Sequence, residues 1–281
     1  ITMGKFDGVL LASDFDNTLI YTEEALRTGK PVPPLSERNR AALERFMAEG
    51  GRFAVATGRA LAAFRKYAPL VPMNTPGIVC NGAALYDFAR EEYLETATLD
   101  ASARERGQAV LEHFPEVAVE AYHIDNVIHA VHPNEYTRQH ERITQVMVTE
   151  APSLPEVPLP LGKLLFESDH ETLERVRTFL DEQGWSGDYE LIFSGKTLLE
   201  MTVRGANKGG MIRRLADRLG IPHECTLAVG DSDNDRAMLE KAGVAAVMAN
   251  GMERVKQLAD IVSENDCDHD GVAEIFARLS V

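Results

Sequence analysis

The chain has 281 residues, of which 44% are hydrophobic, 26% charged and 7% aromatic, as is usual for a globular protein with a buried core. Its 44 acidic residues outnumber its 29 basic residues, and the formal net charge is -15 at pH 7. Because an acidic surface repels nucleic-acid phosphates and anionic membranes, we expect neither nucleic acid nor a membrane as a partner. The length suits one large domain or two modest ones, and we predict two.

The three cysteines, Cys80, Cys225 and Cys267, are far apart and include no C-x-x-C pair. The sequence therefore predicts neither a disulfide framework nor a zinc site built on cysteine. No apolar run reaches the ~18 residues that a membrane-spanning helix needs, and the first residues lack the basic and apolar regions of a signal peptide. We expect a cytoplasmic protein, and the sequence leaves its oligomeric state open.

An apolar run over residues 9–13 ends at two acids, Asp14 and Asp16, which Thr18 follows. This order predicts a strand that delivers two carboxylates to its carboxyl end, where open parallel sheets bind their ligands. Taken alone, the same residues are equally compatible with an ordinary polar turn.

Apolar runs of strand length alternate with amphipathic helical stretches from residue 9 to about residue 88, which is typical of a parallel sheet with crossover helices. Ser36 is placed to cap a helix that ends near residues 50–51. After the first strand, the predicted elements are a strand at 52–56 ending at Thr57, a helix through 61–67, and a strand at 77–80 ending at Asn81. Each strand ends at a polar residue.

The pattern changes at about residue 89 and resumes at Thr197. The intervening segment predicts a helix at 101–114, strands at 117–124 and 127–131, a polar helix, a proline-rich loop at 151–160, and then a strand, helix and strand at 163–167, 171–182 and 189–193. Later strands are expected at 197–203, 226–229, 245–248 and 260–262. We therefore predict an α/β fold: a Rossmann-like, doubly wound parallel-sheet core over 1–88 and 196–281, interrupted by an α+β domain over 89–195.

A second acidic cluster, G-D-S-D-N-D at residues 230–235, follows an apolar run and precedes a helical segment. Mg²⁺ prefers oxygen ligands and commonly takes one or two carboxylates together with water and substrate phosphate. Asp14, Asp16 and an acid of this cluster could together supply such a site. The alternative is that the cluster only caps the helix that follows it.

Two further features favour a bound phosphate. Thr57, Gly58 and Arg59 combine a hydroxyl with backbone N–H groups at a helix start, where anions bind. Lys208 also stands at a helix start, where a cation is unfavourable unless it contacts an anion. A plain threonine cap and a surface lysine are the alternatives.

Taken in chain order, these motifs resemble those of the haloacid dehalogenase superfamily of aspartyl phosphotransferases, and the long insertion resembles the cap domain of its Cof-type (subfamily IIB) branch. The motifs span the chain: D-x-D-x-T at 14–18, A-T-G-R at 56–59, I-V-C-N-G-A at 78–83, N-K-G at 207–209, G-D-S-x-N-D at 230–235 and D-G-V-A at 270–273. The resemblance implies a Mg²⁺-dependent phosphatase that hydrolyses small phosphate monoesters, such as sugar phosphates or related phosphorylated metabolites, through an aspartyl phosphate.

The resemblance also implies a role for individual residues. Asp14 is the expected nucleophile, Asp16 the general acid and base, and Thr57 and Lys208 further catalytic residues. The expected Mg²⁺ ligands are Asp14, the backbone carbonyl of Asp16, and Asp231. The residues expected to hold the phosphoryl group are the Phe15 backbone, Thr57, Gly58, Lys208 and Asn234. Asp235 is expected to orient Lys208. Asn81 and Gly82 resemble the hinge into the cap. Asn17 stands where many members carry glycine, and asparagine tolerates unusual backbone angles.

Two other functions are compatible with the motifs: a sugar phosphomutase of the same superfamily, and a non-catalytic relative that binds phosphorylated metabolites. The insertion also contains His123, His129, His132 and His140, whose spacings do not match an H-x-x-x-H ligand pair. We therefore expect packed or surface histidines rather than a metal site. Tyr122, His123 and Asp125 are candidates for contact with the leaving group of the substrate.

Overall fold

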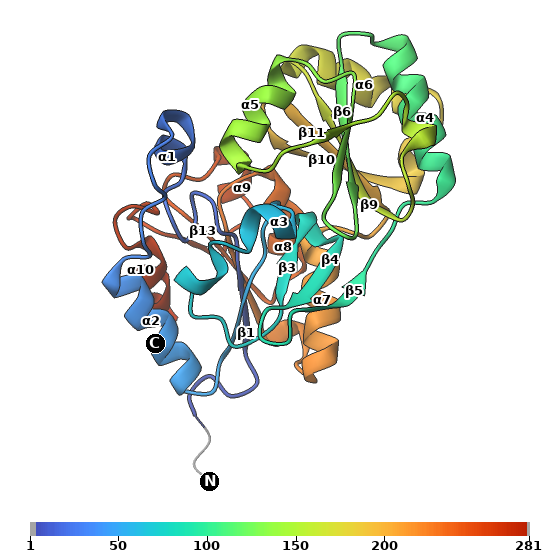
Figure 1. Ribbon diagram of the computed structural model, residues 1–281. Helices are drawn as coiled ribbons and strands as arrows, with labels where there is room; N and C mark the ends of the chain where they lie inside the picture. The colour runs from blue at the N-terminus through green and yellow to red at the C-terminus, as the bar shows by residue number, and fades with distance from the viewer. Residues whose placement is uncertain (1–3, 280–281) are drawn as a thin grey trace.

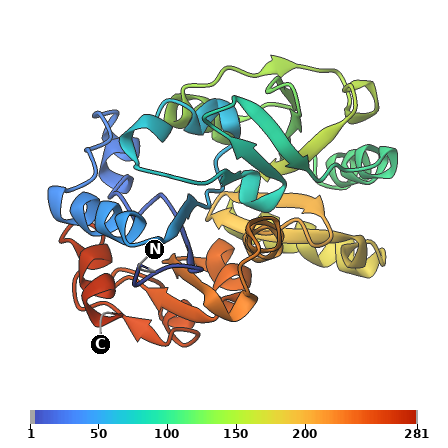
Figure 2. The same cartoon turned by 90° about the horizontal axis from the view of Figure 1, so that it is seen from below.

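The structure is a computed structural model, and it describes residues 4–279. Figure 1 shows two bodies: a parallel sheet between helices, and a second sheet with its own helices that lies over one end of the first. In Figure 2 the first and last parts of the chain, blue and red, lie side by side in the parallel sheet, while the green and yellow middle part forms the other body. The expected core with an inserted α+β unit is present.

The parallel sheet has the strand order β14-β13-β12-β1-β2. Its strands are β1 (Leu10–Ser13), β2 (Arg52–Val55), β12 (Thr226–Gly230), β13 (Val244–Val247) and β14 (Ile261–Val262). Because β1 pairs with β2 on one side and β12 on the other, it is buried along its whole length. Such burial on both faces explains its continuous apolar sequence.

Helices cover both faces of this sheet, as a doubly wound fold requires. Residues of α2 (Glu37–Ala48) and α10 (Gly271–Arg278) pack in one apolar cluster, and those of α7 (Lys208–Leu219) and α8 (Arg236–Lys241) pack in another on the opposite face. The remaining core helices are α1 (Glu23–Thr28), α3 (Leu61–Phe64) and α9 (Glu253–Lys256). Ser36 caps α2 as predicted, since its hydroxyl accepts a hydrogen bond from the Asn39 N–H at 3.1 Å.

The third predicted strand lies at the margin of the parallel sheet. It is β3 (Gly77–Val79), and it forms an antiparallel sheet with β4 (Ala84–Asp87) and β5 (Glu92–Thr96). A parallel bridge between Ala56 and Ile78 joins it to the end of β2. The polar residue that follows β3 is thereby brought to the carboxyl edge of the parallel sheet.

The six-stranded sheet, which we call the cap sheet, has the order β10-β11-β9-β6-β7-β8. Its strands are β6 (Ala118–His123), β7 (Ile128–Val131), β8 (Thr149–Glu150), β9 (Leu161–Glu167), β10 (Tyr189–Gly195) and β11 (Leu198–Val203). The helices of this body are α4 (Ala101–His113), α5 (Glu135–Thr144) and α6 (His170–Glu182). Apolar residues of α4 and α6 pack on one face of the cap sheet.

The strand expected at 197–203 is present but belongs to the cap sheet. As β11 it pairs antiparallel with β9 and β10, so the prediction that it resumes the parallel core is wrong. The physical reason is the two-residue connection after β10, since antiparallel neighbours can be joined by a tight turn whereas parallel strands need a long crossover. We propose that the inserted domain ends near residue 203 rather than at 195.

The two faces of the cap sheet differ in chemistry because side chains alternate along each strand. Val119, Ala121, Leu164 and Phe166 face the apolar cluster beneath α4 and α6. The alternate positions on the same strands and on β11 carry polar side chains that are nonetheless buried: Glu120, Tyr122, Lys163, Glu167 and Glu200. Within residues 4–279, no helix combines the length and apolar character needed to cross a membrane.

A glycine is needed at position 82 because two segments of the chain approach each other closely there. Its φ is +97°, and a Cβ at this position would lie 2.1 Å from the carbonyl oxygen of Asn207. The loop after β3 therefore packs directly on the backbone that begins α7. Any side chain here would displace the start of that helix.

We predict that Gly82→Ala destabilises the protein more than Gly184→Ala. Both glycines have positive φ, but a Cβ at Gly184 meets nothing within 4 Å, so that variant measures backbone strain alone, about 1–2 kcal/mol. Gly82→Ala should lose roughly 1–3 kcal/mol more from the steric clash. The free energy of unfolding in urea measures both, and equal losses would contradict the close approach.

Candidate active site

The ends of β1 and β12 bring the two acidic motifs together. Ser13 is paired with Val229, so the residues that follow, Asp14 and Asp231, leave the sheet at the same edge. Lys208, the first residue of α7, reaches this edge from the side. Its Nζ lies 2.6 Å from Asp14 Oδ1 and 2.8 Å from Asp235 Oδ1, and its side chain is completely buried.

Asp235 organises the loop after β12. One of its carboxylate oxygens contacts Lys208, and the other accepts hydrogen bonds from the backbone N–H groups of Asp231 at 2.9 Å and Ser232 at 3.1 Å. Thr18 donates from its hydroxyl to Asp231 Oδ1 at 2.8 Å. Every acid of the cluster is thereby held in one orientation.

The cluster contains more negative charge than its lysine can balance. One carboxylate oxygen from each of Asp14, Asp231 and Asp235 lies within 4.8 Å of the others. Burial and the neighbouring Asp235 carboxylate raise the pKa of Asp14 well above its usual range, and the same two causes raise the pKa of Asp231 to about 7. An all-oxygen donor set with excess negative charge fits Mg²⁺, so the residues present suit the expected ion.

The Asp16 side chain is engaged elsewhere. It forms a bidentate pair with Arg59, with Nε at 2.9 Å and Nη2 at 2.7 Å, and accepts a hydrogen bond from Thr22 at 2.7 Å. Although burial acts to raise it, the Arg59 guanidinium keeps the pKa of Asp16 below its usual value. The sequence assigns no role to the Arg59 side chain, and the structure places it on Asp16 and over the Tyr67 ring at 4.9 Å.

The expected phosphate-binding residues lie around this edge. Thr57 is fully buried, and its Oγ1 accepts the Arg59 N–H at 3.1 Å. Gly58 lies against the Asn81 side chain, whose Oδ1 accepts from Asn234 Nδ2 at 3.1 Å. The Phe15 side chain packs in the core on Phe64, with ring centroids 5.2 Å apart, which leaves only its backbone for the site.

Asn81 is a further candidate site residue, which sequence reasoning interpreted as a hinge. Its Nδ2 is buried and has no hydrogen-bond partner among the described residues, although its Oδ1 is paired with Asn234. Its backbone adopts a positive φ of 52°, which asparagine tolerates. The signal was available: Asn81 comes at the end of a predicted strand, as Asp14, Thr57 and Asp231 do. Asn17 also has a positive φ of 57°, as expected for its turn.

The cap sheet contributes a buried ion pair next to the expected phosphate-binding residue Gly58. Lys163 Nζ lies 3.1 Å from Glu200 Oε2, 3.4 Å from the Gly58 carbonyl oxygen and 4.4 Å from the Tyr122 ring centroid. Of the predicted leaving-group contacts, Tyr122 therefore faces the site. His123 and Asp125 pair with each other at 2.7 Å, and the Asp125 side chain is 58% exposed. Lys163 and Glu200 were not identified from the sequence.

The raised pKa of Asp231 predicts a pH-dependent stability in protein stripped of metal by a chelator. Its ordinary value is 3.8 and its folded value about 7, so the folded protein keeps a proton that the unfolded chain releases. This group therefore lowers stability as pH rises between about 4 and 7, by at most about 1.4 kcal/mol per unit. Asp231→Asn should lack this contribution.

Urea unfolding of wild type and Asp231→Asn at pH 5 and pH 7.5 measures the difference. We expect the variant to gain stability relative to wild type at the higher pH. Added Mg²⁺ should restore the stability of wild type if it is the ion that this cluster binds in the folded state. Asp233→Asn is the control, since Asp233 lies in the same loop but pairs with Arg254. If the free energies of unfolding of Asp231→Asn and wild type differ by the same amount at both pH values, the raised pKa does not belong to Asp231.

Comparison with known proteins agrees with this geometry. A family model described as haloacid dehalogenase-like hydrolase matches residues 11–276. The chain is 25% identical to the 5-amino-6-(5-phospho-D-ribitylamino)uracil phosphatase YitU of Bacillus subtilis, over 95% of this chain and 96% of that protein. It is also 25% identical to the pyridoxal phosphate phosphatase YbhA of Escherichia coli, over 96% of this chain and 98% of that protein.

A solved structure supports the fold. The phosphatase BT1666 from Bacteroides thetaiotaomicron superposes with a TM-score of 0.81 at 22% sequence identity, over 99% of this chain and 97% of that chain. At this identity the likeness concerns the fold, including both the parallel sheet and the cap sheet.

Proposed function

The chain belongs to the haloacid dehalogenase-like hydrolases, and we propose that it is a Mg²⁺-dependent phosphatase that hydrolyses small phosphate monoesters such as sugar phosphates. One observation carries the proposal: Asp14 lies against the buried Lys208 at the carboxyl edge of a parallel sheet, beside two further acids. The relatives named above, phosphatases of a phosphoribityl compound and of pyridoxal phosphate, support a small phosphorylated metabolite as the substrate.

In the first step an Asp14 carboxylate oxygen attacks phosphorus, and the bond between phosphorus and the ester oxygen breaks. Asp16 donates a proton to the departing alkoxide, which leaves as an alcohol. In the second step water attacks the aspartyl phosphate, Asp16 accepts a proton from that water, and phosphate and the Asp14 carboxylate are released. Mg²⁺, held by Asp14, the Asp16 carbonyl and Asp231, would offset the negative charge of the phosphoryl group.

The other residues position and neutralise the phosphoryl group, which is most of what phosphoryl transfer requires. Lys208 supplies a fixed positive charge, and Thr57, Gly58 and Asn234 surround the same edge with a hydroxyl, a backbone N–H and an amide. We add Asn81 to this set, because its unpartnered Nδ2 is a buried donor beside Gly58. The cap sheet excludes bulk water from this edge when it is closed.

The ion pair between Arg59 and Asp16 affects both proton transfers. In this structure Asp16 is held as a carboxylate, the form that accepts a proton from water in the second step. The first step needs the protonated acid, so the Asp16 side chain must leave Arg59 before it can act. Asp16 therefore needs two orientations: the one seen here, paired with Arg59, and another in which it donates its proton.

We predict that Asp14→Asn abolishes turnover. Removal of a catalytic nucleophile commonly lowers kcat by several orders of magnitude, and we expect a loss of at least ~10³-fold. Asp14 is buried rather than facing solvent, since it is only 4% exposed. The variant should still fold, because Asp235 still pairs with Lys208 and the amide removes repulsion between Asp14 and its acidic neighbours. Phosphate release, with the melting temperature as a check on folding, measures both effects.

The test uses phosphate release from sugar phosphates, a phosphoribityl compound, pyridoxal phosphate, nucleotides and an aryl phosphate, with Mg²⁺ and with chelator. Asp233→Asn serves as the matched control for Asp14→Asn, because its carboxylate pairs with Arg254 outside the cluster. Mg²⁺-dependent release that only Asp14→Asn loses would support the proposal. Isomerisation of a sugar phosphate without phosphate release would replace it with a phosphomutase, and binding without turnover would replace it with a binding protein.

A further inference from the structure

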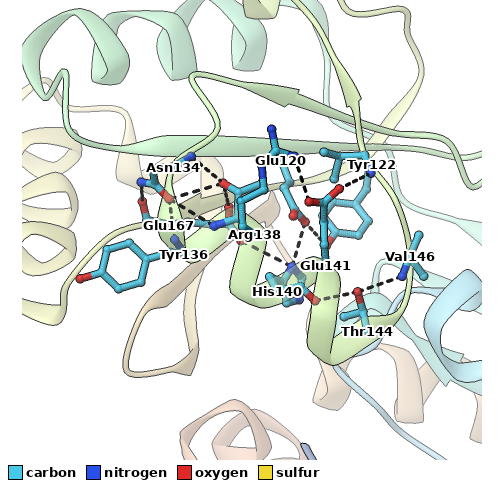
Figure 3. Close-up of polar contacts among 12 residues, drawn as sticks. Glu120, Tyr122, Asn134, Tyr136, Arg138, His140, Glu141, Thr144, Val146 and Glu167 are labelled. Carbon is cyan, nitrogen blue, oxygen red and sulfur yellow. Dashed lines mark hydrogen bonds and ion pairs between the residues drawn. The ribbon is translucent and has the colours of Figure 1, made fainter. Parts of the chain in front are cut away.

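The cap sheet contains a second polar cluster that the proposed phosphatase reaction does not use. Glu120 on β6, Glu167 on β9 and His140 on α5 converge between the sheet and the helix, as Figure 3 shows. One ligand atom from each of the three lies within 4.8 Å of the other two. His140 Nδ1 is 3.0 Å from Glu120 Oε2 and 3.5 Å from Glu167 Oε1.

The cluster leaves a buried acceptor without a hydrogen bond. The Glu167 side chain has no exposed surface, and its Oε1 has no hydrogen-bond partner among the described residues. His140 Nδ1 carries at most one proton, and the shorter contact directs it to Glu120. Glu167 Oε1 therefore points at a nitrogen that cannot satisfy it, and an unpaired buried carboxylate oxygen is strongly unfavourable.

The acids of the cluster also have few cationic partners. Lys163 is paired with Glu200 at 3.1 Å, and Arg138 is paired with Glu141 and Glu150. Two buried acids thus share a single imidazole. Burial and the Glu120 carboxylate raise the pKa of Glu167 to about 8, so this acid holds a proton at neutral pH when no cation is bound. A divalent cation with two carboxylates and a neutral imidazole would be electrically neutral.

The spacing of the three groups matches that of ligands around one ion. Zn²⁺ binds histidine nitrogen and carboxylate oxygen at about 2.0–2.2 Å in a tetrahedral arrangement, which places neighbouring ligand atoms roughly 3.4 Å apart. The two observed separations from His140 Nδ1 lie on either side of this value.

Outer contacts hold both carboxylates in place, as partners of metal ligands commonly do. Tyr122 donates to Glu120 Oε2 at 2.6 Å, and Thr137 donates to Glu167 Oε2 at 2.5 Å.

We propose that Glu120, His140 and Glu167 form a binding site for a first-row divalent transition metal, for which Zn²⁺ is the probe. The imidazole ligand distinguishes this site from the all-oxygen cluster around Asp14, because Mg²⁺ favours oxygen donors. No motif in the sequence indicated this site, since the spacing of the four cap histidines predicted no ligand pair. The site uses one histidine and two acids that are distant in sequence.

A metal here would fix α5 to two strands of the cap sheet. The end of α5 is also one of the places where the cap touches the core, because Lys66 Nζ donates to Gln145 Oε1 at 2.7 Å directly after the helix. The ion would therefore stabilise the part of the cap that contacts α3 and its following turn. Its role is structural, separate from the proposed chemistry at Asp14.

The experiment measures Zn²⁺ per chain. Full-length protein is stripped with chelator, dialysed against micromolar Zn²⁺ in millimolar Mg²⁺, and analysed by elemental emission. His140→Gln and Glu167→Gln each remove one ligand. His129→Gln is the matched control, because His129 is another cap histidine but lies opposite Ala121 on β6, at the position that faces away from the cluster. Asp14→Asn reports any Zn²⁺ bound at the catalytic cluster.

We expect His140→Gln and Glu167→Gln to bind about one Zn²⁺ fewer than wild type, and His129→Gln and Asp14→Asn to keep it. The bound ion should also raise the melting temperature of wild type but not of the two ligand variants. Equal Zn²⁺ content in wild type and both ligand variants, or a Zn²⁺ that only Asp14→Asn removes, would overturn the proposal.

The visible absorption spectrum of bound Co²⁺ tests the proposal on wild-type protein, so the result does not depend on whether a variant folds. In wild-type protein with the catalytic cluster saturated by Mg²⁺, we expect the intense visible absorption of four-coordinate Co²⁺ with a nitrogen ligand. The weak spectrum of six-coordinate Co²⁺ would overturn the proposal on wild type alone.

Discussion

The site depends on one buried cation. An ammonium group without solvent access is unfavourable unless carboxylates lie against it, and Asp14 and Asp235 supply them for Lys208. These residues come from the end of β1, the start of α7 and the loop after β12. A single charge requirement therefore fixes three distant segments relative to one another. Gly82 adds a steric constraint to the same place, because the loop after β3 touches the backbone at which α7 begins.

Much of the core could be predicted because its signals are local. The apolar runs before Asp14, Thr57 and Asp231 are strand-length, and each ends at the edge where the structure places the candidate site. Ser36 is a residue type that commonly caps helices, so its role could be predicted. Lys208 could be singled out because a lysine is unfavourable in the first turn of a helix unless it contacts an anion. In each case a short stretch of sequence contains both the element and the reason for its end, so no distant partner has to be known.

What could not be predicted depends on pairing between distant residues. The alternation of residues 198–203 is equally typical of a core strand and of a cap strand, and only the tight turn after β10 decides between them. The Arg59 contact with Asp16 joins two motifs that each have a separate expected role. Glu120, His140 and Glu167 lie on three elements with no common spacing, which is why the histidine pattern alone indicated no metal site.

The position of β11 has a mechanical consequence. This strand ends at Val203 in the cap sheet, and Lys208 begins α7 after only four intervening residues. Those residues are tied back to the strand, because Thr202 Oγ1 donates to the Ala206 carbonyl oxygen at 2.7 Å and Ala206 N–H donates to Val203 O at 2.9 Å. A displacement of the cap sheet therefore pulls on the helix terminus that carries the buried cation. Any movement of the cap sheet would therefore also shift the buried ammonium group of Lys208 relative to its carboxylate partners.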